Sequence, residues 1–543
     1  MSESDIALHA DVGGEGLQIP AASEACASAA VLAPPAATTG AAEPISLFKR
    51  IAAFPVMLGT LLVGAVFVAG RSFAVDPDLW WHIKNGQNIL DTHHWPTADP
   101  YSFTVAGTPW LSYEWLGDVL FGAVARFAGL QGLDALLIVL GSAILTSLYA
   151  YATLRSGNSK AGFVTAAALY VLVTPSLSLR PQMLGYLFII LTLTVLEYFR
   201  QGKLPALWFL PPLFVLWINT HGSWVIGLAV LFVCLAGGLM NFRIGSIEAR
   251  RWSAQERVRL EVASLLCLAA IPLTPYGTRL AAYPFTVASS LPVNLANVLE
   301  WQPMPFNLLG GKIFLALLLG FFLAQMALRF TCRLDELALF VGGTVAACLH
   351  LRFVLLFVPF FSGLLVMVLA RWAPPYDRRK DKYAANAILM ALVIAAMAWY
   401  FPTRANMQEI ISRKFPVRAV DYVRSHAVPG PMYNTYGYGG YLIWALPEQK
   451  VFIDGRGDLY EAGGAFSDYL EAANLKPAAF AVLRAYRIQS CLLDRSEALA
   501  AVLSNHPDWR AEYSDDVSVL FVRRSGTTSA EAMRGSAAVG QKE

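Results

Sequence analysis

The chain has 543 residues, of which 56% are hydrophobic and only 15% are charged. Soluble globular proteins carry about 25% charged residues, so this composition excludes an ordinary soluble domain and predicts a polytopic, α-helical membrane protein. The formal net charge of +3 says little by itself, because the distribution of Lys and Arg matters more than their sum. We expect no nucleic-acid partner.

The composition changes along the chain and predicts four regions. Residues 1–45 are rich in Ala, Pro, Ser, Thr and Gly without periodicity, which predicts a disordered cytoplasmic tail. Residues 46–403 hold the apolar runs and are predicted to form a transmembrane domain, with a first outer loop over 71–132. A small α/β domain is predicted over 404–525, and a second disordered tail over 526–543.

The transmembrane domain is predicted from apolar runs that approach the roughly 20 residues a helix needs to cross a bilayer. They predict about eleven transmembrane helices, near 51–70, 133–153, 161–177, 182–199, 206–221, 223–241, 260–274, 313–330, 336–351, 353–371 and 384–402.

Lys and Arg are concentrated in alternate connections between these runs, for example at Lys49 and Arg50, between Arg243 and Arg259, and between Arg371 and Lys382. Cytoplasmic loops carry the excess of such residues, so we predict a cytoplasmic N-terminus. An odd number of spans then makes the C-terminal domain extracytoplasmic. The predicted location is the plasma (inner) membrane, as a multi-pass protein in contact with membrane lipids.

Two short helices are predicted in the first outer loop. One covers about 79–90. The other covers about 111–128, where Glu114, Asp118 and Arg126 are four or eight residues apart on an apolar background. Such a pattern is typical of a helix that lies in the membrane interface.

The region after residue 404 alternates helical and strand-like patterns, which predicts a small α/β domain with a largely parallel sheet. Helices are predicted at 417–426, 466–474, 478–486 and 496–505, and strands at 431–434, 450–454, 490–493 and 517–523.

Two glycine-rich motifs stand out in this region, Tyr-Gly-Tyr-Gly-Gly-Tyr at 436–441 and Val-Phe-Ile-Asp-Gly-Arg-Gly-Asp at 451–458. The second motif has the pattern of a buried strand followed by a polar loop, where open α/β sheets bind ligands. Glycine-rich turns are more often structural, and the glycine spacing does not fit a dinucleotide site.

The segment Asp-Pro-Asp-Leu-Trp-Trp-His at 76–82 follows the first span directly. Carboxylates are costly at a lipid boundary, whereas tryptophan favours it. Asp76 and Asp78 are candidates for a catalytic carboxylate that takes a proton from an acceptor, or for a pair that bridges a metal. The structural alternative is that Asp78 caps the following helix.

Three cationic residues lie at predicted outer span ends: Arg180, His350 and Arg352. Arginine binds phosphate in a bidentate geometry, so these residues are candidates for a phosphate clamp at the outer leaflet. The alternative is that each arginine snorkels to the lipid headgroups.

Further polar and aromatic residues are predicted on the same side. Asn219 and His221 lie in a turn between two spans, where the alternative is a self-contained turn. Glu300 and Trp301 end a long outer loop, and a carboxylate beside a tryptophan suits sugar binding. The predicted substrate-binding residues are His82, Trp81, Glu114, Asn219, His221, Glu300 and Trp301.

At these residues the chain resembles the GT-C glycosyltransferases, and is similar in layout to the protein O-mannosyltransferases and the aminoarabinose and oligosaccharyl transferases. The resemblance rests on Asp76 and Asp78 after the first span, the interfacial helices, the polar outer ends and the outer C-terminal domain. It covers about residues 48–525 as architecture. Many relatives carry an Asp-Glu pair where this chain has Asp-Pro-Asp.

The resemblance implies a hexosyl- or pentosyltransferase that uses a polyprenyl-phosphate-linked sugar at the outer leaflet and inverts the anomeric carbon. Its acceptor would be a lipid, a glycan or a protein. Asp78 or Asp76 would take the acceptor proton, while Arg180, His350 and Arg352 would stabilise the departing phosphate. No cofactor is named by the sequence, and a divalent metal on Asp76 and Asp78 stays open.

Two other functions compete with this interpretation. A polysaccharide polymerase or ligase would share the outer-face chemistry but would use a diphosphate-linked glycan. An ion-coupled transporter would need ionisable residues near the bilayer midplane, and no Asp, Glu, Lys or Arg falls in the middle of a predicted span. We therefore rank the transferase first, the ligase or polymerase second and the transporter third.

Overall fold

The computed structural model describes most of the chain, namely residues 46–70, 76–328 and 330–524, without the side chains of 286–290. The predicted tails at 1–45 and 526–543 lie outside the described residues. The described residues divide into two units after Arg50. In the first unit the structure describes the beginning of the short helix α1 (Leu47–Ile51).

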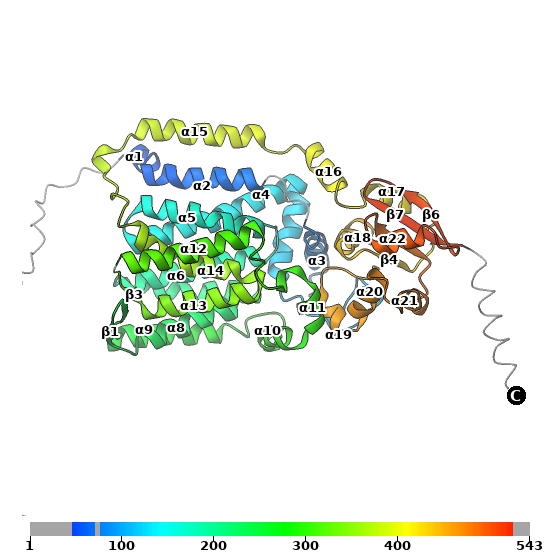
Figure 1. Cartoon of the computed structure of the whole chain (residues 1–543), viewed down its shortest axis with the longest axis horizontal. Helices are drawn as coiled ribbons and strands as arrows, with labels where there is room; N and C mark the ends of the chain where they lie inside the picture. The colour runs from blue at the N-terminus through cyan, green and yellow to red at the C-terminus, as the bar shows by residue number, and fades with distance from the viewer. Residues whose placement is uncertain (1–45, 71–75, 329, 525–543) are drawn as a thin grey trace, which may run out of the picture. The chain divides into compact units, whose positions relative to one another are not determined.

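A helix covers each of the eleven predicted apolar runs (Figure 1). In chain order they are α2 (Phe54–Gly70), α4 (Trp115–Ser156), α5 (Ser159–Val173), α6 (Gln182–Arg200), α7 (Leu210–Ile218) preceded by the 3₁₀ helix η2 (Leu204–Phe209), α8 (Trp224–Gly237), α9 (Ala254–Ala269), α12 (Leu309–Ala327), α13 (Leu334–Leu349), α14 (Val354–Leu369) preceded by η4 (Leu351–Phe353), and α15 (Tyr383–Tyr400).

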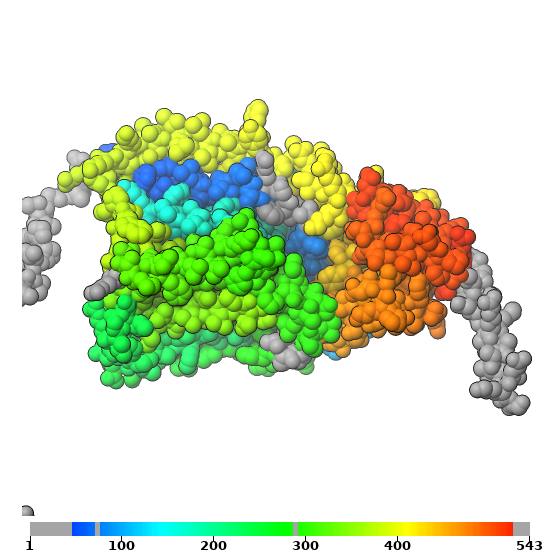
Figure 2. Space-filling model, viewed as in Figure 1, coloured from blue at the N-terminus to red at the C-terminus, as the bar shows by residue number. Residues whose placement is uncertain are grey.

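These helices fit a polytopic membrane protein. Among the described residues, five helical segments are long and apolar enough to cross a bilayer, namely 115–156, 182–200, 309–327, 351–369 and 383–400. The others are shorter or more polar, so the number of eleven crossings stays a prediction. Helix α15 lies beside α2 and buries little of its own surface (Figures 1 and 2).

Both helices predicted in the first outer loop are present. The first is α3 (Leu79–Thr92), which ends where His93 adopts a left-handed conformation and donates its N–H to the carbonyl of Ile89. The second is the beginning of α4, which bends at Gly129, with φ of 63° and ψ of −156°. The bend separates the loop segment 115–128 from the apolar remainder of α4.

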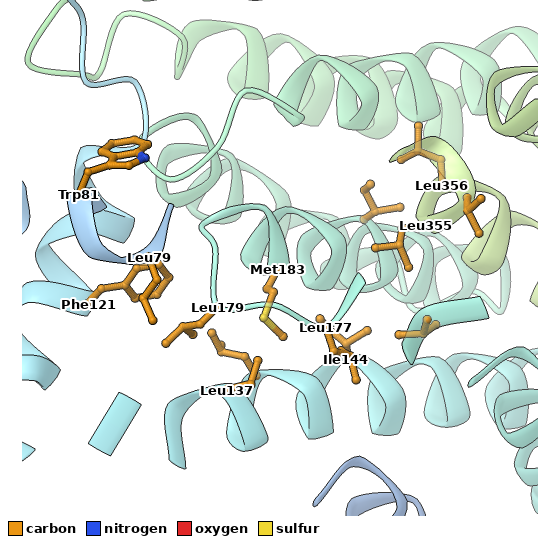
Figure 3. Close-up of a cluster of buried hydrophobic side chains, with 14 of the residues drawn as sticks. Leu79, Trp81, Phe121, Leu137, Ile144, Leu177, Leu179, Met183, Leu355 and Leu356 are labelled. Atoms are coloured by element: carbon orange, nitrogen blue, oxygen red, sulfur yellow. The ribbon is translucent and has the colours of Figure 1, made fainter. Parts of the chain in front are cut away.

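The outer-loop helices rest on a continuous apolar core, part of which is drawn in Figure 3. Leu79 and Trp81 of α3, Phe121 and Leu137 of α4, and Met183 of α6 belong to it and are all less than 9% exposed. The loop that precedes α3 is therefore attached to a packed base.

The connection between α9 and α12 holds three short helices, α10 (Arg279–Ser290), α11 (Pro292–Asn297) and η3 (Leu299–Trp301). A small three-stranded sheet joins the connection between α8 and α9 to the connection between α12 and α13. Its strands are β1 (Phe242–Ile244), β2 (Ile247–Ala249) and β3 (Cys332–Arg333), in the order β1-β2-β3.

Residues 404–524, which we call the C-terminal domain, contain a four-stranded sheet in the order β4-β5-β7-β6. The strands are β4 (Met432–Asn434), β5 (Ser490–Asp494), β6 (Trp509–Ser514) and β7 (Ser518–Arg523). The helices are α16 (Arg404–Ser412), α17 (Val417–Ser425), η6 (Tyr436–Tyr438), α18 (Gly439–Ala445), α19 (Gly457–Ala462), α20 (Ala465–Ala473), α21 (Ala479–Ala485) and α22 (Ala498–Leu503).

The prediction of a largely parallel sheet is wrong. Only β4 and β5 are parallel, whereas β7 runs antiparallel to both β5 and β6. The sequence analysis missed β6, which joins β7 through a tight turn in which Asp515 accepts the backbone N–H groups of Val517 and Ser518. A carboxylate that satisfies these groups favours a hairpin.

The predicted strand at 450–454 is also wrong, because this segment pairs with the first outer loop instead of the sheet. Val451 donates its N–H to the carbonyl of Tyr101 and accepts the N–H of Phe103. Phe452 and Ile453 are fully buried, which explains their strand-like pattern. The segment thereby joins the C-terminal domain to the first outer loop.

Candidate active site

A cavity of about 220 Å³ lies where the first outer loop, the neighbouring helix ends and the C-terminal domain meet. It brings together nine of the twelve predicted site residues, which come from six separate segments of the chain: Asp78, Trp81, His82, Glu114, Arg180, His221, Glu300, Trp301 and Arg352. Asp76, His350 and Asn219 do not line it.

Arg180 is the centre of the charged wall of this cavity. Its Nε lies 2.8 Å from Asp76 Oδ2, one Nη lies 2.9 Å from Asp78 Oδ2, and the other lies 2.9 Å from Glu300 Oε1. Each guanidinium nitrogen thus meets a different carboxylate. One positive charge faces three acidic groups, so the cluster is not charge-balanced.

The two aspartates differ in their surroundings. Asp76 is more deeply buried and accepts the backbone N–H of Asp78 at 2.9 Å. Burial opposes its ionisation, but Arg180 and this N–H outweigh burial and hold the pKa of Asp76 below its ordinary value. Burial raises the pKa of Asp78, although Arg180 opposes the shift. Asp78 is therefore the more basic carboxylate, and it lines the cavity.

Asp78 occupies the position before α3, but its side chain makes no capping hydrogen bond to the helix. The carboxylate is turned toward Arg180 instead. The alternative that the Asp78 side chain caps the helix is therefore wrong.

The residues present do not fit a metal centre at Asp76 and Asp78. Both carboxylates, together with Glu300, already meet the guanidinium of Arg180, which takes the place that a bridging cation would need. Within the described ranges, no group of three His, Cys, Asp or Glu residues has the arrangement of a metal site.

A second polar cluster is built around His82 of α3. Its Nδ1 lies 2.5 Å from Asp118 Oδ1, and the other oxygen of Asp118 accepts from Asn85 at 2.6 Å and Ser112 at 2.9 Å. Burial disfavours the imidazolium, but Asp118 and Glu114 outweigh it and raise the pKa of His82. Asp118 thus fixes the orientation of the ring, whose Nε2 lies 3.8 Å from Glu114.

Glu114 lies between His82 and a second histidine, His221. Burial raises the pKa of Glu114 to about 8. Burial also lowers the pKa of His221 to about 3, so this ring is neutral. Its Nδ1 accepts the N–H of Ser223 at 3.1 Å, which leaves the ring proton on Nε2, 3.4 Å from Glu114.

Arg352 is the cationic residue of the cavity that lacks an ion pair among the described residues. Its guanidinium lies 4.2 Å from the ring centroid of Trp301. His350 does not reach the cavity, because its Nδ1 lies 2.6 Å from the carbonyl oxygen of Trp301 and its ring packs edge-on against the indole. His350 therefore contacts Trp301 and helps to hold it in place.

Asn219 has a structural role. Its amide group donates to the carbonyls of Val215 and Leu273, and its carbonyl oxygen accepts from Trp115 Nε1 at 2.8 Å. Leu273 and Trp115 are 54 and 104 residues away, so Asn219 ties its turn to two other segments and the turn is not self-contained.

The C-terminal domain contributes part of the wall through residues that were not predicted as site residues, namely Tyr436 and 455–458. Arg456 is 3% exposed and pairs with Asp454 and Asp99, each at 2.7 Å. Its guanidinium also lies 4.6 Å from the ring centroid of Trp110. A fully paired buried arginine ties the glycine-rich loop to the first outer loop.

The residues that the sequence analysis missed carried weak signals. Asp118 was noted only for its helical spacing, and its contact with His82 joins positions 36 residues apart. The glycine-rich motif at 451–458 was noted, but nothing in the sequence indicates its partner Asp99, 357 residues away.

Comparisons with known proteins identify likeness of structure only. No family model matches the chain, and no curated protein matches it either. Several solved structures match, at TM-scores below 0.5. One is the oligosaccharyltransferase of Archaeoglobus fulgidus tethered with an acceptor peptide, with 12% identity and a TM-score of 0.49 over 82% of this chain and 69% of that chain.

The second likeness is to ArnT from Cupriavidus metallidurans. Its apo structure has 14% identity and a TM-score of 0.49 over 88% of this chain and 97% of that chain. The structure of ArnT bound to undecaprenyl phosphate has 14% identity and a TM-score of 0.47 over 88% and 98%. The chain thus has a structural likeness to an oligosaccharyltransferase and to ArnT. At these scores, no residue role is transferred from them.

Proposed function

We propose that this protein is a membrane glycosyltransferase that moves a sugar from a polyprenyl-phosphate carrier to an acceptor at the outer face of the membrane. The proposal rests on the placement of Asp78 and Arg352 in one cavity. Asp78 shares a single arginine with two other carboxylates. Arg352 has no ion pair among the described residues and lies over the ring of Trp301. A transfer needs a proton acceptor and a binding site for the leaving phosphate.

Asp78 takes the proton of the acceptor hydroxyl or amine as that group attacks the anomeric carbon. The new bond to the acceptor forms while the bond between the anomeric carbon and the phosphate oxygen breaks, and the electron pair leaves with the polyprenyl phosphate. Arg352 pairs with the negative charge of that phosphate. Attack opposite to the leaving group inverts the anomeric carbon.

Asp76 and Arg180 hold Asp78 in place for this step. Asp76 holds Arg180 and the backbone of Asp78, and Arg180 holds one oxygen of Asp78. Trp81 and Trp301 offer the aromatic faces on which sugar rings stack. Glu114 is the second candidate for the proton acceptor, since its pKa of about 8 lies near physiological pH.

The cation count favours a monophosphate donor over the diphosphate donor of a polymerase or ligase. Arg180 and Arg456 line the cavity but are each engaged by two or more carboxylates. Arg352 alone among the described lining arginines has no carboxylate partner, and one free guanidinium matches one phosphate better than two.

Mass spectrometry of lipid carriers and surface glycans in a strain lacking this gene tests the proposal. We expect a polyprenyl-phosphate-linked sugar to accumulate and one sugar modification to disappear. Accumulation of a diphosphate-linked glycan would favour the ligase or polymerase, and unchanged lipids and glycans would contradict both.

The predicted membrane orientation has its own test. Reporter fusions after residues 157, 248 and 420 should give cytoplasmic signals at the first two positions and an extracytoplasmic signal at the third. A cytoplasmic signal at residue 420 would place the cavity on the wrong side for a lipid-linked donor at the outer leaflet.

A further inference from the structure

Two glycines of the C-terminal domain lie directly against the loop that carries the candidate base. A Cβ atom added to Gly440 would overlap the carbonyl oxygen of Pro77. A Cβ atom added to Gly455 would overlap Oδ1 of Asp78, and the three nearest atoms around that position all belong to Asp78. Both glycine-rich motifs of the domain therefore meet the same short loop.

Backbone conformation does not explain these two glycines. Gly464 of the same domain has a φ of 78° and needs glycine for its turn, whereas neither Gly440 nor Gly455 has a positive φ. Neither position therefore lies in the left-handed region that favours glycine. The absence of a side chain matters because of the close approach to Pro77 and Asp78.

This approach restricts the Asp78 carboxylate from both sides. Arg180 lies 2.9 Å from Oδ2, and the backbone at Gly455 lies against Oδ1. The carboxylate is thereby kept from turning back to cap α3, where no capping bond is formed.

The loop around Gly455 is held in place by contacts on both of its sides. Before it, Asp454 accepts from Arg456 and from Tyr460 Oη at 2.5 Å. After it, Asp458 accepts from the hydroxyl of Tyr283, and Glu461 accepts the backbone N–H groups of 293 and 294 at 2.7 and 2.8 Å. The wall behind Asp78 is a fixed surface and does not depend on Gly455 alone.

We propose that Gly455, supported by Gly440, is a positioning residue through which the C-terminal domain sets the orientation of the Asp78 carboxylate. The domain is then a wall of the active site and not an appendage to the transmembrane part. The positional claim stands on contacts alone, whereas its effect on turnover rests on the proposed function.

A double-mutant cycle tests the positional claim without any activity. Thermal unfolding of the full-length protein would be compared for Gly455→Ala in the wild-type and Asp78→Ala backgrounds. The new methyl group overlaps only Asp78 among its nearest atoms, so we expect a lower melting temperature in the wild-type background and little or no loss in the Asp78→Ala background.

Gly437 provides the matched control, because it lies in the same motif as Gly440 and no described atom lies within 4 Å of its Cβ position. Gly437→Ala should leave the melting temperature unchanged. If Gly455→Ala does not fold, the proposal predicts that adding Asp78→Ala restores folding. An equal loss in both backgrounds, or no loss in either, would overturn the proposal.

The second readout separates positioning from stability. Once the lipid-linked donor is identified, folded Gly455→Ala should have a kcat lower by about 10²-fold, as a displaced catalytic group does, with a donor KM close to that of the wild type. Its pH profile should shift, because the contact between Asp78 and Arg180 changes. If the double-mutant cycle shows that Gly455 and Asp78 are coupled but the wild-type protein transfers no sugar, the proposed function is contradicted. The claim that Gly455 positions Asp78 would still hold.

Discussion

Two clusters of charged residues lie at opposite ends of helix α6 and are built differently. The site cluster consists of Asp76, Asp78, Arg180 and Glu300, where one arginine meets three carboxylates. The far-end cluster consists of three arginines and three carboxylates, namely Arg155, Glu197, Arg200, Arg333, Asp335 and Glu336.

Each arginine of the far-end cluster has a close carboxylate partner of its own, and Arg333 also lies 3.6 Å from Glu336. Arg155 binds Glu336 through two nitrogens, at 2.6 and 3.0 Å, and Arg333 binds Glu197 in the same way, at 2.6 and 3.2 Å. Arg200 pairs with Asp335. Buried charges are stable when each is paired and hydrogen-bonded, and this cluster meets that condition fully.

The two clusters differ in charge balance, and this difference separates an ion-pair network that stabilises the fold from one that we propose takes part in the reaction. A balanced, bidentate network holds helix ends together and leaves no charge for a substrate. In the unbalanced network Asp78 shares Arg180 with two other carboxylates, and it faces the cavity that Arg352 also lines. Neutralising a residue of each cluster should therefore change different properties.

The largest effect on stability is expected at the far end. Glu336→Gln leaves Arg155 buried without its bidentate partner, and breaking a buried pair costs about 3–5 kcal/mol in the free energy of unfolding. Transfer per folded molecule should stay the same, as measured by activity normalised to folded protein. Glu409→Gln, at an exposed pair with Arg413, is the control and should change stability little. A loss of turnover without a loss of stability in Glu336→Gln would contradict the claim that the far-end cluster only stabilises the fold.

The next effect concerns donor binding. Arg352→Lys keeps the charge but loses the bidentate fork and the planar contact with Trp301. We expect the donor KM to rise by about tenfold, which corresponds to ~1.4 kcal/mol, with an unchanged melting temperature. The snorkelling interpretation predicts instead that the Lys variant uses the donor as the wild type does, so steady-state kinetics at varied donor concentration separates the two.

The smallest effect is a pH dependence of stability at Glu114. Burial raises the pKa of the folded carboxyl to about 8, from 4.5 in the unfolded chain. Between these values the unfolded state loses the proton that the folded state keeps, so the free energy of unfolding falls as the pH rises. Glu114→Gln should flatten the fall in melting temperature between pH 5 and 8. Identical slopes for the two proteins would show that Glu114 is not buried as a neutral acid.

The apolar helices and the charged residues beside them could be predicted from the sequence, because both depend on local patterns. Apolar runs locate the eleven apolar helices among the described residues, and Asp76, Asp78 and Arg352 stand out as charged residues beside such runs. The pairing of these residues could not be predicted. Arg180 and Asp76 are 104 residues apart, and their contact depends on how the helices pack.

The contact between the C-terminal domain and the first outer loop could not be predicted either, because it joins residues that are far apart in the sequence. The buried segment at 451–453 has the alternation and apolarity of a strand, but its backbone partner is the first outer loop at Tyr101 and Phe103. Sheet pairing and loop pairing need the same residue types, so the sequence does not separate them. His350 and Asn219 were similarly predicted from residue type, whereas their side chains are used by neighbouring carbonyl groups.

The rate at which purified protein releases polyprenyl phosphate from its lipid-linked donor, compared between wild type and Asp78→Asn, tests the central claim most directly. Asparagine keeps the size of the side chain, and Arg180 keeps its ion pairs with Asp76 and Glu300, so both proteins should fold and melt alike. The account predicts a rate lower by roughly 10²–10⁴-fold in Asp78→Asn, since general-base assistance is lost. Release at the wild-type rate would contradict it and move the proton acceptor to another carboxylate.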